Sequence, residues 1–241
     1  MTTTLLLIRH ASNDLLKEHR MGGRMPGVHL NEQGRAEAEA LADRLARTDL
    51  AAVYSSPMER ARETARFIAD RHGLEVRIHP GLHEVDCGQW SGQPTDRLRE
   101  DPYWLPLRIY PAWVPFPGGE TSWQVQVRFL AALEEIRAAH PDQTVAVVSH
   151  ADPIRLAVAH YIGLPIDLFR RLSVSPASLT VVAFDPLPRP RTLPALAWCA
   201  STIRPIWKGC RGCVPILSGA SDSARRTEKK ILKTPLAGRR E

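Results

Sequence analysis

The sequence predicts an α/β fold in three layers, α/β/α, with helices covering both faces of a mostly parallel central sheet. Short, unbroken apolar runs alternate with longer segments whose apolar residues recur at helical spacing. Apolar runs without polar alternation are typical of strands that are buried on both faces. Three of these runs end abruptly at a polar pair: Arg9-His10, Ser55-Ser56 and Ser149-His150.

The first half of the chain alternates strand and helix. The expected elements are a strand over residues 4–8, a helix over 31–47, a strand over 50–54, a helix over 57–71 and a strand over 76–79. Asn31 is placed to cap the first helix, because its side-chain oxygen can accept a hydrogen bond from a free backbone N–H. Ser56 and Pro57 are expected to cap and open the second helix.

The second half begins with an irregular segment. Residues 88–119 are rich in Pro, Trp and Gly, and we expect one short helix among them, lying over an end of the sheet as a substrate rim. The rim would carry Trp90, Trp104 and Trp113. The remaining expected elements are a helix over 120–139, a strand over 144–148, a helix over 153–161 and a last strand over 178–184.

Composition divides the chain after Asp185. Residues 1–185 hold 20 Lys and Arg against 23 Asp and Glu, whereas residues 186–241 hold 12 against 3 and many prolines. We expect one catalytic domain over 1–185 and a basic, Pro-rich, disordered tail over 186–241. A basic tail can bind nucleic acid or anionic lipid nonspecifically, but it is more often only solvated and mobile, so nucleic acid is not an expected partner.

Compartment and metal content can also be predicted. No apolar stretch reaches the roughly 18 residues that suggest a membrane helix, and the N-terminus does not resemble a signal peptide, so we expect a cytoplasmic protein without a membrane partner. Disulfides are not expected there. Cys210 and Cys213 have the spacing of half a zinc site, but no second pair completes it. Cys87 and Cys199 complete the set of cysteines.

The polar pairs suggest phosphate chemistry. Ligands of open parallel sheets bind at the carboxyl ends of the strands, where all three pairs are expected. Transfer of a phosphoryl group needs cations around its oxygens, a nucleophile in line and an acid for the leaving oxygen. Arginine suits the first task, neutral imidazole the second and a carboxyl group the third.

The sequence also resembles a known family. Residues 5–184, about three-quarters of the chain, are similar to the histidine phosphatase superfamily, also called the phosphoglycerate mutase-like family. Single blocks are weak signals, but their common order is strong. The matching blocks are Leu7-Ile8-Arg9-His10-Ala11, residues 27–34, residues 55–65, residues 82–92, residues 116–121 and Val147-Val148-Ser149-His150.

The resemblance implies a role for each matched residue. His10 would be the nucleophile and become a phosphohistidine, while Arg9, Arg60 and His150 would hold the phosphoryl oxygens. Glu84, with Asp86 two residues away as the alternative, would protonate the leaving oxygen and then activate water. The family needs no metal and no organic cofactor for hydrolysis. The partner would be a small phosphorylated molecule, and the protein a monomer or homodimer.

The sequence departs from the family pattern at three positions. Ala11 replaces the usual Gly, which is tolerated only if the backbone φ there is ordinary. Asn13 and Leu16 replace a Ser or Thr and an Asn, so one phosphate contact would be missing or supplied elsewhere, with Arg24 as a candidate. Asp152 is expected to cap the following helix or to orient a neighbour.

Phosphatase is the first choice among the functions of the family. Only 66 positions separate Glu84 from His150, whereas the mutases carry a long insertion there. The alternatives are a cofactor-dependent phosphotransferase of the phosphoglycerate mutase type and, because of the departures, a non-catalytic protein that binds a phosphorylated ligand. A nucleic-acid-binding protein rests on the tail alone.

Overall fold

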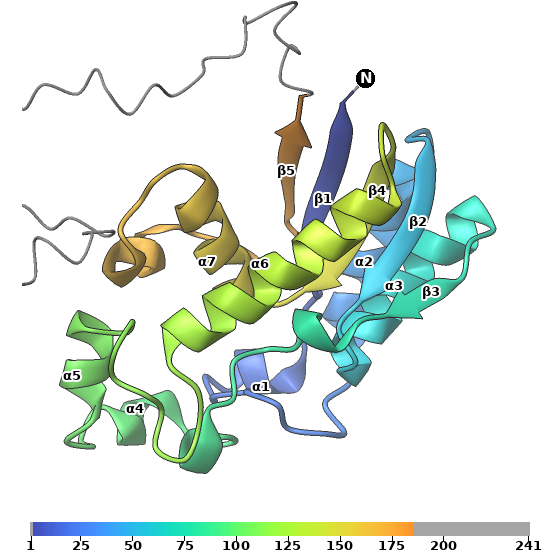
Figure 1. The fold of residues 1–241 in the computed structure, drawn as a ribbon. Helices are drawn as coiled ribbons and strands as arrows, with labels where there is room; N and C mark the ends of the chain where they lie inside the picture. The colour runs from blue at the N-terminus through green and yellow to red at the C-terminus, as the bar shows by residue number, and fades with distance from the viewer. Residues whose placement is uncertain (1, 186–241) are drawn as a thin grey trace, which may run out of the picture. The chain divides into compact units, whose positions relative to one another are not determined.

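The computed structural model describes residues 2–185, which form a five-stranded sheet between two layers of helices (Figure 1). The strand order is β3-β2-β4-β1-β5, in which β5 is antiparallel to β1 and the other neighbours are parallel. The strands are β1 (Thr3–Arg9), β2 (Leu50–Ser55), β3 (Val76–Ile78), β4 (Thr144–Ser149) and β5 (Leu179–Phe184).

Seven α-helices and three short 3-10 helices connect the strands of the described region. The α-helices are α1 (Asp14–Lys17), α2 (Glu32–Leu45), α3 (Glu59–His72), α4 (Thr95–Leu98), α5 (Trp104–Ile109), α6 (Ser122–Ala139) and α7 (Ala151–Tyr161). The 3-10 helices are η1 (Pro80–Leu82), η2 (Gly88–Trp90) and η3 (Ile166–Arg171). Figure 1 shows α6 in front of the sheet and α2 and α3 behind it.

Alternation along β1 explains the three layers. Leu5 and Leu7 pack in a cluster with Phe129 of α6, whereas Leu6 and Ile8 pack in a second cluster that contains residues of α2 and α3. Successive side chains of a strand point to opposite faces, so this unbroken apolar run serves both cores. The predicted three-layer α/β/α fold is confirmed.

Register brings the three polar pairs to one edge of the sheet. Arg9 lies opposite Ser149, and Ser55 lies opposite Val148. Two further hydrogen bonds of 2.9 Å continue the ladder past the strand ends, from the His10 N–H to the Ser149 carbonyl and from the Ser56 N–H to the Val148 carbonyl. Segments that lie far apart in the chain therefore meet side by side.

Local structure differs from the expectation in three places. Helix α3 begins at Glu59, and its N-cap is Met58, which provides no side-chain cap. The prediction that Ser56 caps this helix and Pro57 opens it is therefore wrong, because the Ser56 hydroxyl is hydrogen-bonded to His150 instead. Residues 88–119 hold two short α-helices where one was expected, and α1 was not expected at all.

Several expectations concern residues that the structure does not describe. The proposed tail, with Cys199, Cys210 and Cys213, lies outside the described residues, and the predictions for it remain predictions. Cys87 is buried and has a free thiol. Within the described part of the chain, no helix combines the length and apolar character needed to cross a membrane.

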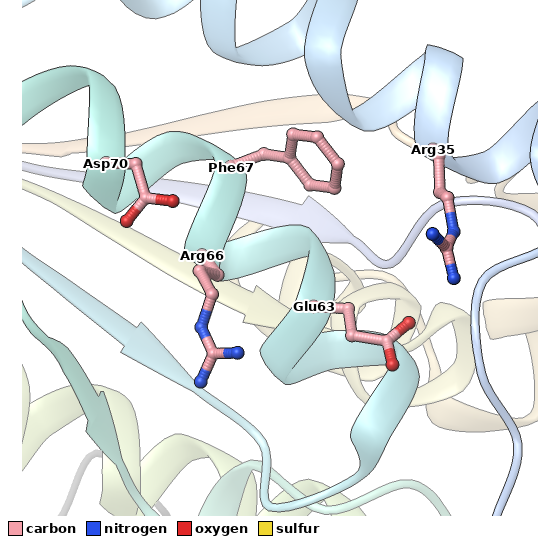
Figure 2. A pocket seen from close by; sticks show the side chains of 5 residues that line it. All are labelled: Arg35, Glu63, Arg66, Phe67 and Asp70. Atoms are coloured by element: carbon pink, nitrogen blue, oxygen red, sulfur yellow. The ribbon is translucent and has the colours of Figure 1, made fainter.

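The helical layer of α2 and α3 carries a surface pocket (Figure 2). Arg35 of α2 lines it together with four residues of α3: Glu63, Arg66, Phe67 and Asp70. Its two guanidinium groups balance its two carboxylates, and it contains none of the polar residues at the strand ends. The histidines and arginines that follow the strands lie at the sheet edge and not in this pocket.

Candidate active site

Two histidines meet at the sheet edge. His10 follows β1 and is 3% exposed, and His150 follows β4 and is fully buried. Their ring centroids lie 5.1 Å apart, with an angle of 63° between the planes. Because β1 and β4 are hydrogen-bonded neighbours, the backbone itself fixes this pairing.

The environment of His10 keeps its imidazole neutral and fixes its tautomer. Nδ1 lies 2.8 Å from the Ala11 carbonyl oxygen, which can only accept, so Nδ1 carries the hydrogen and Nε2 the lone pair. Burial is the main cause of a pKa well below the ordinary value, and the charges of Arg60 and Arg9 lower it further. An uncharged imidazole with a free lone pair is a nucleophile.

Two guanidinium groups are held beside the histidines. Arg9 Nη1 donates to the Val174 carbonyl at 2.7 Å, and Arg60 Nη2 donates to the Gly23 carbonyl at 2.7 Å. Arg9 Nε and Arg60 Nη1 are buried and have no hydrogen-bond partner. Burial lowers the pKa of both groups, and the Glu84 carboxylate opposes that shift. Each arginine thus keeps one buried donor available for an anion.

His150 offers a third buried donor or acceptor. Its Nε2 lies 2.8 Å from Ser56 Oγ, which also accepts from the Met58 N–H at 3.4 Å. The serine hydroxyl has one hydrogen to give and two lone pairs, so it can pair with Nε2 of His150 in either tautomer of the imidazole. Nδ1 is buried without a hydrogen-bond partner and lies 3.8 Å from Glu84 Oε2.

The carboxyl group of Glu84 has a pKa near neutrality. Its side chain is 15% exposed, and Oε1 accepts from the Val85 N–H at 2.9 Å. Burial, followed by the charge of Asp152, raises its pKa from 4.5 to about 7 against the opposing effect of Arg60 and Arg9. Such a group can hold a proton at neutral pH and release it to a leaving oxygen.

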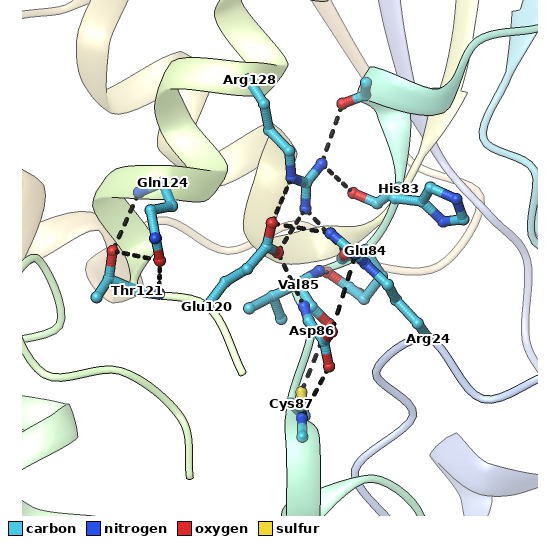
Figure 3. Close-up of polar contacts among 12 residues, drawn as sticks. Arg24, His83, Glu84, Val85, Asp86, Cys87, Glu120, Thr121, Gln124 and Arg128 are labelled. Atoms are coloured by element: carbon cyan, nitrogen blue, oxygen red, sulfur yellow. Dashed lines mark hydrogen bonds and ion pairs between the residues drawn. The ribbon is translucent and has the colours of Figure 1, made fainter. Parts of the chain in front are cut away.

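An ion-pair network holds the loop that carries Glu84 (Figure 3). Arg128 of α6 donates to the carbonyl oxygens of Gly81, His83 and Glu84 at 3.0, 2.8 and 2.9 Å. Its guanidinium also contacts both carboxylate oxygens of Glu120, at 2.9 and 3.0 Å. The five contacts fix the backbone on which the carboxyl group stands.

Arg24 belongs to the same network. It contacts Glu120 at 2.8 Å and donates to the Glu84 carbonyl at 3.0 Å (Figure 3). The sequence suggested that Arg24 could supply a missing phosphate contact, but its guanidinium is already engaged in holding this loop. Glu120 in turn accepts from the Asp86 N–H at 3.0 Å. The Asp86 carboxylate accepts from the Gly88 N–H at 2.9 Å and lies 3.9 Å from Arg24, so its contacts are within the loop.

Two of the three departures from the family pattern, Ala11 and Asn13, have local explanations. Ala11 is buried with an ordinary φ, and its N–H donates to Thr64 Oγ1 at 3.1 Å. Asn13 caps α1 by accepting from the Leu16 N–H at 3.0 Å. Asp152 does not cap α7, whose N-cap is His150; it binds Arg155 at 2.9 Å and so orients a neighbour.

The structure brings all five expected residues together, and it adds two supporting residues: Ser56, which the sequence offered only as a helix cap, and Thr64, which it did not single out. The expected residues are His10, Glu84, Arg9, Arg60 and His150. Ser56 orients His150, and Thr64 links Ala11 to Arg60 by donating to the Arg60 carbonyl at 2.8 Å. Both lie in the matched block over 55–65, which was the available signal. No group of three or more His, Cys, Asp or Glu within residues 2–185 is arranged to hold a metal.

Together, fold and site define an enzyme that acts on phosphate esters through a histidine. Residues 5–188 match the model of the histidine phosphatase superfamily, branch 1, and the chain belongs to this family. It is a phosphoric monoester hydrolase that works through a phosphohistidine, as predicted.

Individual relatives agree with this class. The chain is 35% identical to phosphoserine phosphatase 1 of Hydrogenobacter thermophilus over 187 residues, which cover 75% of this chain and 86% of the relative. It is 31% identical to glucosyl-3-phosphoglycerate phosphatase of Mycolicibacterium vanbaalenii, covering 68% and 76%. The solved structure of a mycobacterial glucosyl-3-phosphoglycerate phosphatase superposes with a TM-score of 0.69 at 28% identity, covering 76% of this chain and 91% of that chain.

Proposed function

We propose that His10 Nε2 attacks the phosphorus atom of a small phosphorylated metabolite, while Arg9, Arg60 and His150 hold the phosphoryl oxygens. The N–P bond forms as the ester P–O bond breaks. Glu84 gives its proton to the leaving oxygen, which departs as an alcohol. The buried donors on Arg9, Arg60 and His150 support this assignment, because preorganised donors stabilise the charge of the transferred group.

The second half of the reaction reverses these roles. Glu84, now a carboxylate, takes a proton from a water molecule as its oxygen attacks phosphorus. The N–P bond breaks, inorganic phosphate leaves, and His10 returns to its neutral form with the hydrogen still on Nδ1. A pKa of about 7 for Glu84 suits a group that must give and take a proton at the same pH.

One observation carries the proposal. The Ala11 carbonyl, 2.8 Å from Nδ1, directs the lone pair of His10 to Nε2 before any substrate binds. Without this contact the imidazole could present its N–H to phosphorus and would not react. Residues 1–185 contain every group in the scheme, so we propose that they are the catalytic domain. We also propose that the protein acts in the cytoplasm, as a monomer or homodimer.

The substrate is proposed only as a class. The relatives are named for phosphoserine and glucosyl-3-phosphoglycerate. Both are small phosphate monoesters, and we propose a substrate of the same kind for this chain.

A direct assay tests the scheme. The full-length protein and a His10→Ala variant would be offered p-nitrophenyl phosphate in the presence of EDTA. We expect turnover by the wild type and none by the variant, with His160→Ala as a control because His160 lies exposed on α7. Equal turnover by wild type and His10→Ala would contradict the proposal.

The same preparation separates the alternatives. A protein that binds phosphate but releases no nitrophenol would be a non-catalytic binder. An enzyme that passes the phosphoryl group to phosphoglycerate faster than to water would be a phosphotransferase. We expect free phosphate and nitrophenol to appear in equal amounts.

A further inference from the structure

A second pocket, of about 330 Å³, lies where α5, α7, η3 and the segment 88–119 meet. We call it the arginine pocket, because three guanidinium groups line it: Arg108, Arg155 and Arg170. One carboxylate, that of Asp152, lines it as well. The remaining lining residues are apolar or aromatic: Met21, Trp90, Trp104, Leu107 and Phe116.

The arginine pocket has an excess of positive charge. Asp152 is bound to Arg155 at 2.9 Å. Arg108 and Arg170 form no ion pair within residues 2–185; they lie over the rings of Trp104 and Phe169 at 5.3 and 4.7 Å. Three cations against one anion leave a net charge of +2 on the pocket lining. Arg108 is exposed, whereas Arg155 and Arg170 are half-buried, and like charges that line one cleft favour binding of an anion.

Arg155 also has an unused donor. Its Nε is buried and has no hydrogen-bond partner, although Nη1 is occupied by Asp152. A buried donor without a partner is costly, and a bound acceptor would relieve that cost. This observation is independent of the charge count and points in the same direction.

Aromatic rings form the apolar part of the pocket lining. Trp90 is 3% exposed; its ring packs edge-on against Phe116 at 5.6 Å and lies at a tilt of 36° to the ring of Trp104 at 5.9 Å. Its Nε1 donates to Asp101 at 3.1 Å, which fixes the ring. A carbon skeleton could therefore lie against these rings while its charged end meets the arginines.

The pocket adjoins the phosphate site through α7. Asp152 stands two residues after His150, and its charge raises the pKa of Glu84. Repulsion between like charges also acts between Arg155 and Arg9, and it lowers the pKa of Arg9. Groups that interact electrostatically with both Glu84 and Arg9 lie at the border of the site where the ester is cleaved.

We propose that the arginine pocket binds a second anionic group, a carboxylate or another phosphate, on the organic part of the substrate. This inference rests on the proposed function and narrows it. The substrate class becomes a phosphate monoester with a second acidic group, separated from the ester by a short apolar skeleton. Arg108, Arg155 and Arg170 are then specificity-determining residues.

Matched substrates test the pocket. A series of phosphorylated hydroxy acids of increasing chain length would each be compared with its own methyl ester, which has the same skeleton without the charge. At the best chain length we expect the acid to have the higher kcat/KM, by about tenfold for one charge-assisted contact. Arg108→Gln should remove this preference by raising KM for the acid. Arg44→Gln, which removes the same charge at an exposed position of α2, should keep the preference.

A binding measurement separates failure of the pocket from failure of the catalytic scheme. The same ligands, together with bisphosphorylated analogues, would be titrated by calorimetry into a His10→Ala background with and without Arg108→Gln. Tighter binding of acid or bisphosphate than of ester, lost with Arg108→Gln, supports the pocket even if the wild type releases no phosphate. Equal affinities for acid, bisphosphate and ester, or a preference that survives Arg108→Gln, would overturn it.

Discussion

At the scale of single residues, the reactivity of His10 depends on a carbonyl oxygen and two cations. The Ala11 carbonyl sets the tautomer, and burial with Arg60 and Arg9 keeps the ring uncharged. The sequence motifs predicted which residues gather, because strand ends in a parallel sheet share one edge. They could not predict the tautomer or the role of Ser56, because both depend on contacts between distant segments.

The pH dependence of the first step follows from Glu84. The acid must be protonated, and with a pKa raised to about 7 its protonated fraction falls as pH rises through that value. We expect kcat/KM for an alkyl phosphate to fall about tenfold per pH unit well above pH 7. Measuring the rate between pH 5 and pH 9 checks this, and a flat profile above pH 7 would contradict it.

Replacing the acid should depend on the leaving group. Glu84→Gln should lower kcat for an alkyl phosphate by about 10²- to 10⁴-fold, because the alkoxide then leaves without a proton. The loss should be smaller for p-nitrophenyl phosphate, whose leaving group is stable as an anion. Glu134→Gln, on the exposed face of α6, is the matched control.

At the scale of elements, helix positions decide how the site is held. The patterns predicted α2, α3, α6 and α7 well, and the Asn31 cap of α2 is confirmed. The short helices of the segment 88–119 were harder, because helices of one or two turns leave little periodicity to read. Two elements support the site from outside it: α6 through Arg128, and α2 through Gly34.

Arg128 is expected to matter for both stability and rate. Arg128→Met removes the guanidinium from the Gly81 and His83 carbonyls and leaves Arg24 as the one arginine on Glu120 and on the Glu84 carbonyl, so we expect the free energy of unfolding to fall by about 2 kcal/mol. Because the loop carries Glu84, kcat should fall more than KM changes. Arg137→Met, on the same helix with an exposed ion pair to Glu134, should change neither. Equal effects of the two variants would contradict the positioning role.

Gly34 marks a close approach of α2 to the segment after His10. A Cβ on Gly34 would lie 1.9 Å from the Ser12 carbonyl oxygen, which is a backbone atom. Gly34→Ala gains about 1 kcal/mol of helix propensity but costs about 3 kcal/mol in overpacking, so we expect a net loss. Denaturant unfolding measures it, with Glu39→Ala as a control. A stabilised Gly34→Ala protein would contradict the close approach.

At the scale of the whole molecule, topology assembles the site. Strands β1, β4 and β2 are neighbours in the sheet, although long segments separate them in the chain. The sequence predicted a mostly parallel sheet, but local patterns hold no information on strand order. The order β3-β2-β4-β1-β5 places His10 next to His150 and leaves Ser56 within reach of the latter.

The covalent intermediate tests the central claim most directly. The enzyme would be mixed with substrate, quenched in base, in which a phosphohistidine survives, and digested for mass spectrometry. We expect one phosphoryl group on the peptide that contains His10, lost on brief exposure to acid and absent from His10→Ala. A phosphoryl group on any other residue, or turnover in which labelled phosphate never attaches to the protein, would contradict the account.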